Sequence, residues 1–216
     1  MNKKRLAIYF FGALPLIMVC LVYKNLPDLV PMQFQSDGGI RYGEKWKLFL
    51  IAGLSLAMGV FMPLMAKIDP RRENYSKFFP VYERIVLIIE VFMAVTMGIV
   101  ILETLFPGRI PVIRVVSGTV GLMFVLLGNM MPKVKSNYFT GIKTPWALSS
   151  ETVWNKTQRL GGKMFFFGGL VMFLSAFVFP IQMMQYITIG LVCLIVLAPT
   201  LMSYVWYQNE IKSIEK

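Results

Sequence analysis

Six long apolar segments constrain this sequence more than any other feature does. They are Leu6–Tyr23, Leu48–Met65, Val81–Leu102, Pro111–Met131, Met164–Pro180 and Met183–Trp206. Each is close to the length of about 20 residues with which a helix crosses a bilayer. Backbone polar groups in hydrocarbon must be satisfied within the segment, so we expect helices rather than strands. The predicted fold class is an all-α integral membrane protein with six transmembrane helices.

The composition agrees with a membrane location. Only 15% of the 216 residues are charged, whereas about a quarter are charged in a soluble domain. The net charge of +11 does not indicate nucleic-acid binding, because the basic residues lie at the ends of the apolar segments. The chain has no histidine, and its two cysteines, Cys20 and Cys193, lie inside apolar segments. We therefore expect no disulfide, no metal site and no cofactor.

The basic residues also predict an orientation. Most of the 22 lysines and arginines lie on one side of the predicted spans. The positive-inside rule places that side, with both termini and the connection 132–163, in the cytoplasm. The N-terminus has the basic head and apolar body of a signal peptide but no small-residue cleavage site, so we expect an uncleaved first span. We expect one polytopic membrane domain over 1–216, with halves 1–107 and 108–216.

Two kinds of residue inside the spans predict how the helices pack. Prolines predict kinks or close packing. Small residues four positions apart predict close approach of two backbones. The prolines are Pro15, Pro63 and Pro199, and the small pairs are Ser55 with Gly59 and Ser117 with Gly121.

The connection 25–47 is predicted to form a small hairpin on the extracellular face. Apolar residues alternate in VPMQF, the sequence SDGG at 36–39 is a turn signal, and Ile40 and Tyr42 suit a return strand. We expect Tyr42 and Trp46 at headgroup depth. One interpretation is an ordered loop that seals the bundle, and the other is a recognition surface. The residues assigned to extracellular recognition are Pro27, Pro31, Phe34, Gly38 and Trp46.

Glu90 and Asn129 are the polar residues singled out inside the predicted spans. A lone carboxylate in mid-membrane is costly, so Glu90 should face other helices, be protonated or have a partner. Glu83, seven residues earlier, shares its helical face. The functional interpretation is a proton relay or a ligand anchor, and the structural one is a hydrogen bond to a neighbouring helix.

The connection 132–163 is predicted to be folded. Thr144 followed by Pro145 suits the start of a short helical turn, and Ser149 or Ser150 suits the cap of a second helix. We expect that second helix to end near Leu160, before a hinge at 161–162. Tryptophans beside basic residues are typical of a helix at the membrane interface. The alternative interpretation is a platform that docks a cytoplasmic protein.

The residues of this connection resemble the signature of the SdpI family of bacterial membrane proteins. The matching residues are Phe139, Gly141, Ile142, Thr144, Pro145, Trp146, Leu148, Val153, Trp154 and Arg159, preceded by Asn129 and Pro132. The segment LPDLVPMQF, followed by glycine and Lys-Trp-Lys, is similar to the small domain that often precedes this signature. Family members often have Arg in place of Lys143, and His in place of Gln158 and Gln33. Because this chain has no histidine, the resemblance carries over no mechanism that rests on one.

The resemblance implies a non-enzymatic immunity protein of the cytoplasmic membrane. It would neutralise a secreted, sporulation-delaying type of toxin peptide and signal to a cytosolic regulator, with membrane lipid as a further partner. The residues assigned to this cytoplasmic motif and to partner docking are Phe139, Gly141, Lys143, Thr144, Pro145, Trp146, Trp154 and Arg159.

Two other classes of function fit the sequence less well. A small proton-coupled carrier would be centred on Glu90, but such carriers have internal repeats, and no second span has an acidic counterpart. An intramembrane enzyme would need catalytic groups, and the sequence has no histidine and no carboxylate pair at catalytic spacing.

Overall fold

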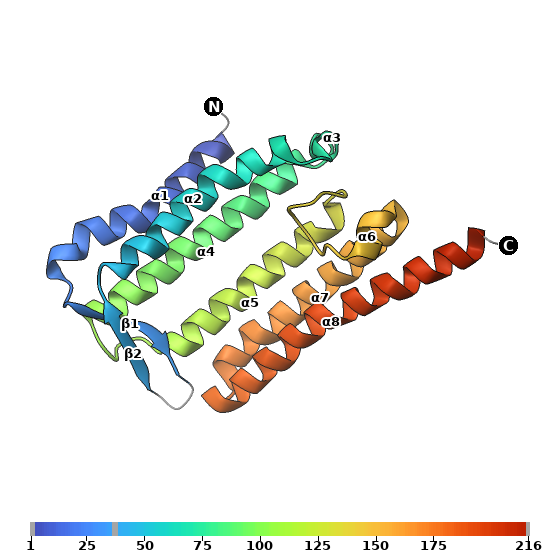
Figure 1. The fold of residues 1–216 in the computed structure, drawn as a ribbon. Coiled ribbons are helices and arrows are strands. Elements are labelled where there is room, and N and C mark those ends of the chain that lie inside the picture. Colours follow the sequence, from blue (N-terminus) through green and yellow to red (C-terminus); the bar gives the residue numbers. More distant parts are fainter. Residues whose placement is uncertain (1–2, 36–38, 215–216) are drawn as a thin grey trace.

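A computed structural model describes residues 3–35 and 39–214 of the chain (Figure 1). Within this part, six helices are long and apolar enough to cross a membrane. They are α1 (Lys3–Val22), α2 (Lys47–Ile68), α4 (Phe79–Leu105), α5 (Val112–Met130), α7 (Glu151–Val178) and α8 (Ile181–Ile214). The predicted all-α membrane fold with six spans is confirmed. The helices continue through Pro15, Pro63 and Pro199.

The long helices form two groups, as Figure 1 shows. In the first group α1 packs against α2 and α4, and in the second α7 packs against α5 and α8. The contact between the groups is carried mainly by α4 and α5. Large apolar side chains such as Leu21, Phe177 and Tyr186 are more than two-thirds exposed on the outside of the bundle. In a membrane protein such a surface faces lipid.

One end of the bundle carries a β-hairpin, and we call it the hairpin end. Strands β1 (Leu29–Phe34) and β2 (Ile40–Glu44) pair antiparallel, with Val30 opposite Gly43 and a bulge between Pro31 and Gln33. The predicted hairpin is therefore confirmed, although its turn at 36–38 lies outside the described residues. Val30 is fully buried and packs in a cluster with residues of α1, α2 and α4, so the hairpin is attached to the first group.

The opposite end, which we call the α6 end, holds the short elements. They are α3 (Arg72–Tyr75), the 3-10 turn η2 (Met131–Lys133) and α6 (Pro145–Ser149), while a second 3-10 turn, η1 (Tyr23–Asn25), lies at the hairpin end. The two described termini of the chain both lie at the α6 end (Figure 1). A buried aromatic cluster there joins Tyr75, Phe78 and Tyr82 of the first group with Trp154 of α7.

The predicted separate interfacial helix and its hinge at 161–162 are wrong. Ser150 does cap a helix, accepting a hydrogen bond from the Val153 amide, but that helix is α7, which runs without interruption to Val178. Gly161 and Gly162 are buried inside it. A Cβ at Gly162 would lie 2.8 Å from the carbonyl oxygen of Gly128, so this glycine serves close packing rather than bending.

The same kind of contact holds α5 to α7 along their length. A Cβ at Gly121 would lie 2.6 Å from the amide nitrogen of Phe173, and one at Gly128 would lie 2.5 Å from that of Phe166. Gly169 faces the carbonyl oxygen of Gly121 in return. The two backbones therefore touch directly, with no side chain between them. The predicted close packing at Gly121 is confirmed.

Candidate functional site

The two loops at the α6 end fold together around a buried carboxylate. Asp69, 1% exposed, follows α2. Its Oδ1 accepts a hydrogen bond from the Arg71 amide (2.7 Å), and its Oδ2 accepts from the Tyr138 amide (2.9 Å) and the Tyr75 hydroxyl (3.1 Å). Burial, together with the nearby Asp69 charge, raises the pKa of Tyr75 well above its ordinary value. Asp69 thus joins the loop after α2 to the loop after α5.

Asn137 fixes the fold of the second loop from within. It is fully buried, and its Nδ2 donates to the carbonyl oxygens of Lys135 and Thr140 at 2.8 and 3.0 Å. Its Oδ1 accepts from the amides of Phe139 and Thr140 at 2.9 and 2.6 Å. One side chain therefore satisfies four backbone groups, as buried polar groups require.

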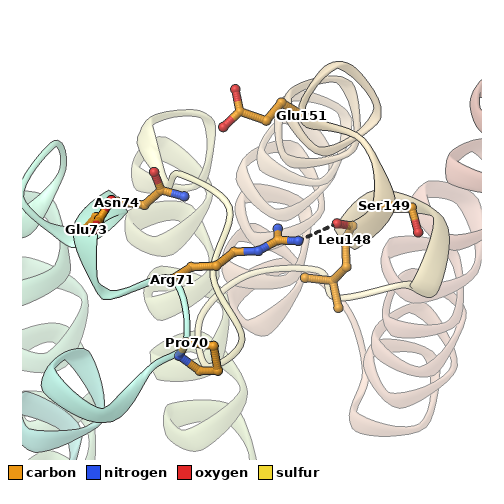
Figure 2. A pocket seen from close by; sticks show the side chains of 7 residues that line it. All are labelled: Pro70, Arg71, Glu73, Asn74, Leu148, Ser149 and Glu151. Carbon is orange, nitrogen blue, oxygen red and sulfur yellow. Dashed lines mark hydrogen bonds between the residues drawn. The ribbon is translucent and has the colours of Figure 1, made fainter.

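Arg71 bridges the two helix groups. Its Nη2 donates to the carbonyl oxygen of Leu148 (2.7 Å), Nη1 donates to the Ser136 hydroxyl, and the guanidinium lies over the Tyr138 ring at 5.2 Å. Figure 2 shows this side chain reaching from the loop after α2 toward α6. Around it is a pocket of about 320 Å³. The lining residues are Pro70, Arg71, Glu73, Asn74, Leu148, Ser149 and Glu151.

The motif residues fall into a buried and an exposed set. Thr144 and Trp154 are buried: Thr144 caps α6 and contacts the Ser203 hydroxyl at 2.8 Å, and Trp154 Nε1 donates to the Val134 carbonyl at 2.9 Å. In this structure those two side chains hold the loop, and their assignment to partner docking stays a prediction. Gly141 is half-buried, and Trp146 is half-buried against the Tyr204 ring. The exposed residues are Phe139, Lys143, Pro145 and Arg159.

Gly141 occupies a position that only glycine suits. Its φ is +102°, and a Cβ there would lie 2.7 Å from Oε1 of Gln158. Gln158 is fully buried and holds the peptide groups of Ile142. The Gln158 side chain is therefore part of the loop structure.

At the hairpin end the predicted recognition residues are spread over two surfaces. Pro27 and Trp46 are exposed, and Trp46 Nε1 donates to Glu44 at 2.5 Å. Pro31 is buried within β1, whereas Phe34 is half-buried and lines a cavity. Gly38 lies outside the described residues.

Glu90 lies at the crossing of three helices. It is fully buried, its Oε2 accepts from the Ser55 hydroxyl at 3.0 Å, and Gly12 and Gly59 face its two oxygens. The cavities described at either end of the bundle do not reach it. The hydrogen bond to a neighbouring helix is the one that the structural interpretation predicted. Asn129, by contrast, is exposed on the surface of the bundle.

Glu83, the residue that shares a face with Glu90, is paired with α1. Arg5 Nε lies 3.0 Å from Glu83 Oε1, and the guanidinium lies over the Phe79 ring. The sequence analysis assigns none of Asp69, Arg71 and Asn137 to a site. A signal for them existed, because polar residues cluster at 69–76 and 135–140, but their pairing across more than 60 positions is not visible in the sequence.

In the described part of the chain, no group of three or more metal-ligating side chains lies close enough to hold an ion. Cys20 and Cys193 are unpaired and exposed.

Comparison with known proteins gives two matches. Residues 133–203 match the SdpI/YfhL protein family. The chain is 22% identical over 207 residues to a Bacillus subtilis (strain 168) protein named Immunity protein SdpI, covering 96% of this chain and 97% of that one. No solved structure matches.

Proposed function

Because this chain is a member of the SdpI family, we propose that it is a membrane immunity protein that binds a secreted toxin peptide. The observation that carries the proposal is the likeness to a protein of that name, which extends over nearly the whole of both chains. A match of that extent includes the hairpin and all six long helices as well as the signature loop. The protein is a multi-pass protein of the bacterial cytoplasmic membrane, and we propose that it acts by binding, without catalysis and without a cofactor.

The orientation follows from charge. The α6 end carries Arg5, Lys67, Arg72, Lys133 and Lys156, and acidic residues are fewer there. By the positive-inside rule this end lies in the cytoplasm and the hairpin end lies outside. A toxin that arrives from outside meets the hairpin first.

The hairpin end offers the surface that recognition needs. Trp46 is 47% exposed and Tyr42 is 58% exposed, and both are amphipathic rings that suit the membrane interface. An apolar toxin partitions into that layer, so contact with these rings would compete with free lipid. Pro27 lies exposed on the same connection.

A signal to a regulator requires that toxin binding alters the α6 end. The two helix groups meet at both ends of the bundle, and Arg71 ties them together at the α6 end through Leu148 and Ser136. A toxin bound at the junction would favour one arrangement of the groups over another, and only a difference in affinity between the two can produce a signal. A change there would alter the pocket around Arg71 and the exposed residues Phe139, Lys143 and Arg159.

The test is to express the protein in a sensitive cell and to challenge the cell with a panel of secreted toxin peptides. Protection should be weakened by Trp46→Ala with Tyr42→Ala and unchanged by Glu90→Gln. Membrane abundance is measured for each variant, so that loss of protein is separated from loss of recognition. If solute transport that follows the pH gradient requires Glu90 and no peptide is neutralised, the immunity proposal is overturned.

Signalling is tested separately with two variants at the α6 end. Lys143→Ala with Arg159→Ala removes exposed charge and should abolish co-purification of a cytosolic regulator while protection by toxin binding persists. Lys156→Ala, an exposed basic residue of α7 outside the assigned docking set, is the matched control. Equal loss with the control would show that charge alone, and not this surface, retains the partner.

A further inference from the structure

A cavity of about 200 Å³ lies at the hairpin end, where the two helix groups meet. Its walls come from the hairpin, from the end of α4, from the start of α5 and from the first residue of α8. Most of the lining is apolar, including Phe34, Ile40 and Ile181. Two charged side chains, Glu103 and Arg114, also line it.

Glu103 has an unsatisfied oxygen in this wall. The residue is 6% exposed, and its Oε1 accepts a hydrogen bond from the Gly108 amide at 2.9 Å. Its Oε2 is buried and has no hydrogen-bond partner among the described residues. Leaving a buried carboxylate oxygen without a donor costs free energy. The cavity is therefore suited to a ligand that brings a donor.

The side chain of Arg114 is held in place by a hydrogen bond to α7. Its Nη1 donates to the carbonyl oxygen of Ala176 on α7 at 2.9 Å. A guanidinium has five N–H donors, so this bond fixes the group and leaves donors for an acceptor in the cavity. Glu103 and Arg114 together make the site neutral overall, with an acceptor on one wall and a donor on another. The complement of such a site is a group that contains both a donor and an acceptor, rather than a single ion.

An apolar groove lies next to the cavity and shares two lining residues with it. Arg114 and Pro111 also line a groove of about 290 Å³ between α5 and α7. Its other walls include Gly118, Leu122, Phe173 and Phe177. Leu122 and Phe177 are exposed on the membrane-facing side of the bundle. The groove therefore places apolar surface beside the polar cavity, on the side of the bundle that faces lipid.

We propose that the cavity and groove form one binding site for an apolar peptide. A main-chain amide of the peptide donates to Glu103, a main-chain carbonyl accepts from Arg114, and the apolar side chains lie along α5 and α7. The proposal rests on the immunity function and adds the place and the polar contacts of toxin binding. A bare hydrocarbon chain of a lipid cannot satisfy the two polar groups, which is why we favour a peptide.

The site can be tested with a defined probe. Cys20→Ser and Cys193→Ser remove the native thiols, and Ile113→Cys places one thiol in the wall of the cavity. The full-length protein in lipid nanodiscs is then labelled with a membrane-impermeant maleimide. An acetylated and amidated tripeptide of leucine and valine, which has main-chain donors and acceptors but no charge, should slow the labelling.

Variants of Glu103 and Arg114 test whether these two side chains contact the tripeptide. Glu103→Leu and Arg114→Leu should each weaken the protection by the tripeptide about tenfold or more. Glu103→Gln, which keeps an acceptor oxygen, should retain most of it, and Thr119→Trp should fill the groove and abolish it. Circular dichroism and gel filtration confirm that each variant is folded. Glu103→Met and Arg114→Met, which also lack the polar group, replace any leucine variant that fails to fold.

The outcomes separate this site from the immunity function. The proposed site is overturned if the tripeptide does not slow labelling of the thiol at 113. It is also overturned if the tripeptide protects Glu103→Leu as well as it protects the parent protein. Both conclusions hold whatever the result of the toxin challenge in cells. If the tripeptide binds as expected but no toxin is neutralised in cells, the site stands and the immunity proposal fails. If a single-chain lipid slows the maleimide labelling as much as the tripeptide does, the groove holds lipid. That result also overturns the proposal.

Discussion

Gln158 and Ile142 are joined by two hydrogen bonds between one side chain and one residue's backbone. Nε2 of Gln158 donates to the carbonyl oxygen of Ile142 at 2.9 Å, and Oε1 accepts from the Ile142 amide at 3.2 Å. Sixteen positions separate them, so the pair fastens the loop after α5 to the start of α7. A primary amide is suited to this role, because it has a donor and an acceptor side by side.

We expect Gln158→Glu to destabilise the protein by about 1 to 3 kcal/mol, because the new oxygen faces the Ile142 carbonyl without a donor in a buried site. The thermal unfolding midpoint of the detergent-purified protein measures this. Gln33→Glu, at an exposed position of β1, is the matched control and should leave the midpoint nearly unchanged. Equal midpoints for the two variants would show that the Ile142 contact contributes little.

Trp154 and Trp146 should respond differently to the same substitution. Trp154 is buried and donates to Val134, so Trp154→Ala should cost about 3 to 5 kcal/mol and reduce the amount of protein in the membrane. Trp146→Ala removes a half-exposed ring and should leave the protein in the membrane. Membrane abundance by immunoblot is the measurement. Normal abundance of Trp154→Ala would contradict the structural role given to that side chain.

Glu90 should tolerate a neutral isostere but not added bulk around it. Glu90→Gln keeps an acceptor for the Ser55 hydroxyl, so we expect little change in thermal stability. Gly12→Val should destabilise the protein, because a Cβ at Gly12 already lies 3.3 Å from Glu90 Oε2 and 3.6 Å from the Gly59 Cα. Gly53→Val, where a Cβ meets nothing within 4 Å, is the control for adding valine to a helix. A folding defect of Glu90→Gln greater than that of Gly12→Val would reverse this order.

The raised pKa of Tyr75 predicts that the folded protein loses stability at alkaline pH. Burial and the Asp69 charge raise the pKa of Tyr75 in the folded state, whereas the unfolded state ionises near the ordinary value of about 10. Below that value both states keep the proton, and above it only the folded state does. The contribution of Tyr75 is therefore complete below about pH 10 and falls by up to about 1.4 kcal/mol per pH unit above it.

The measurement is the difference in unfolding midpoint between about pH 8 and about pH 11. Tyr75→Phe should lose less stability across that interval than the parent protein does. The parent protein and Tyr75→Phe share all the other tyrosines. The difference between their losses of stability therefore reports Tyr75 alone. An identical difference in both proteins would contradict the assignment.

The orientation is tested by labelling single thiols in intact cells. In the background without Cys20 and Cys193, Tyr42→Cys should react with an impermeant maleimide from outside, and Lys143→Cys should react only after the cells are opened. Both positions are exposed, so accessibility of the side chain does not confuse the comparison. Reaction of the thiol at position 143 from outside would show that the orientation is the opposite of the one proposed. The docking proposal would then fail as well.

The helices and the hairpin were predictable because their signals are local. The spans follow from unbroken apolar runs, and β1 follows from alternation over six residues. The fusion of the loop helix with the fifth span was not predicted, because two adjacent glycines favour a break in sequence reasoning. Packing against the α5 backbone overrides that preference, since Gly162 lies against Gly128.

The hydrogen bonds of Asp69 and Arg71 at the α6 end could not be predicted from the sequence, for a different reason. The bonds of Asp69 to Tyr138 and of Arg71 to Leu148 join residues 69 and 77 positions apart. No periodicity encodes such a pair, and only the packing of α2, α4, α5 and α7 brings the loops together. Trp154 shows the same limit, because its ring and basic neighbours indicated an interface, whereas α7 turns the ring inward.

The direct contact of the α5 and α7 backbones has a mechanical consequence. Neither helix can rotate about its axis or slide along the other without driving a carbonyl or a side chain into main-chain atoms, so the pair must travel as a single stiff body. The link at 106–111 joins α4 to α5, and Gly108 in it adopts a φ of +75°. A movement of either helix at one membrane surface is therefore shared by its partner at the other surface.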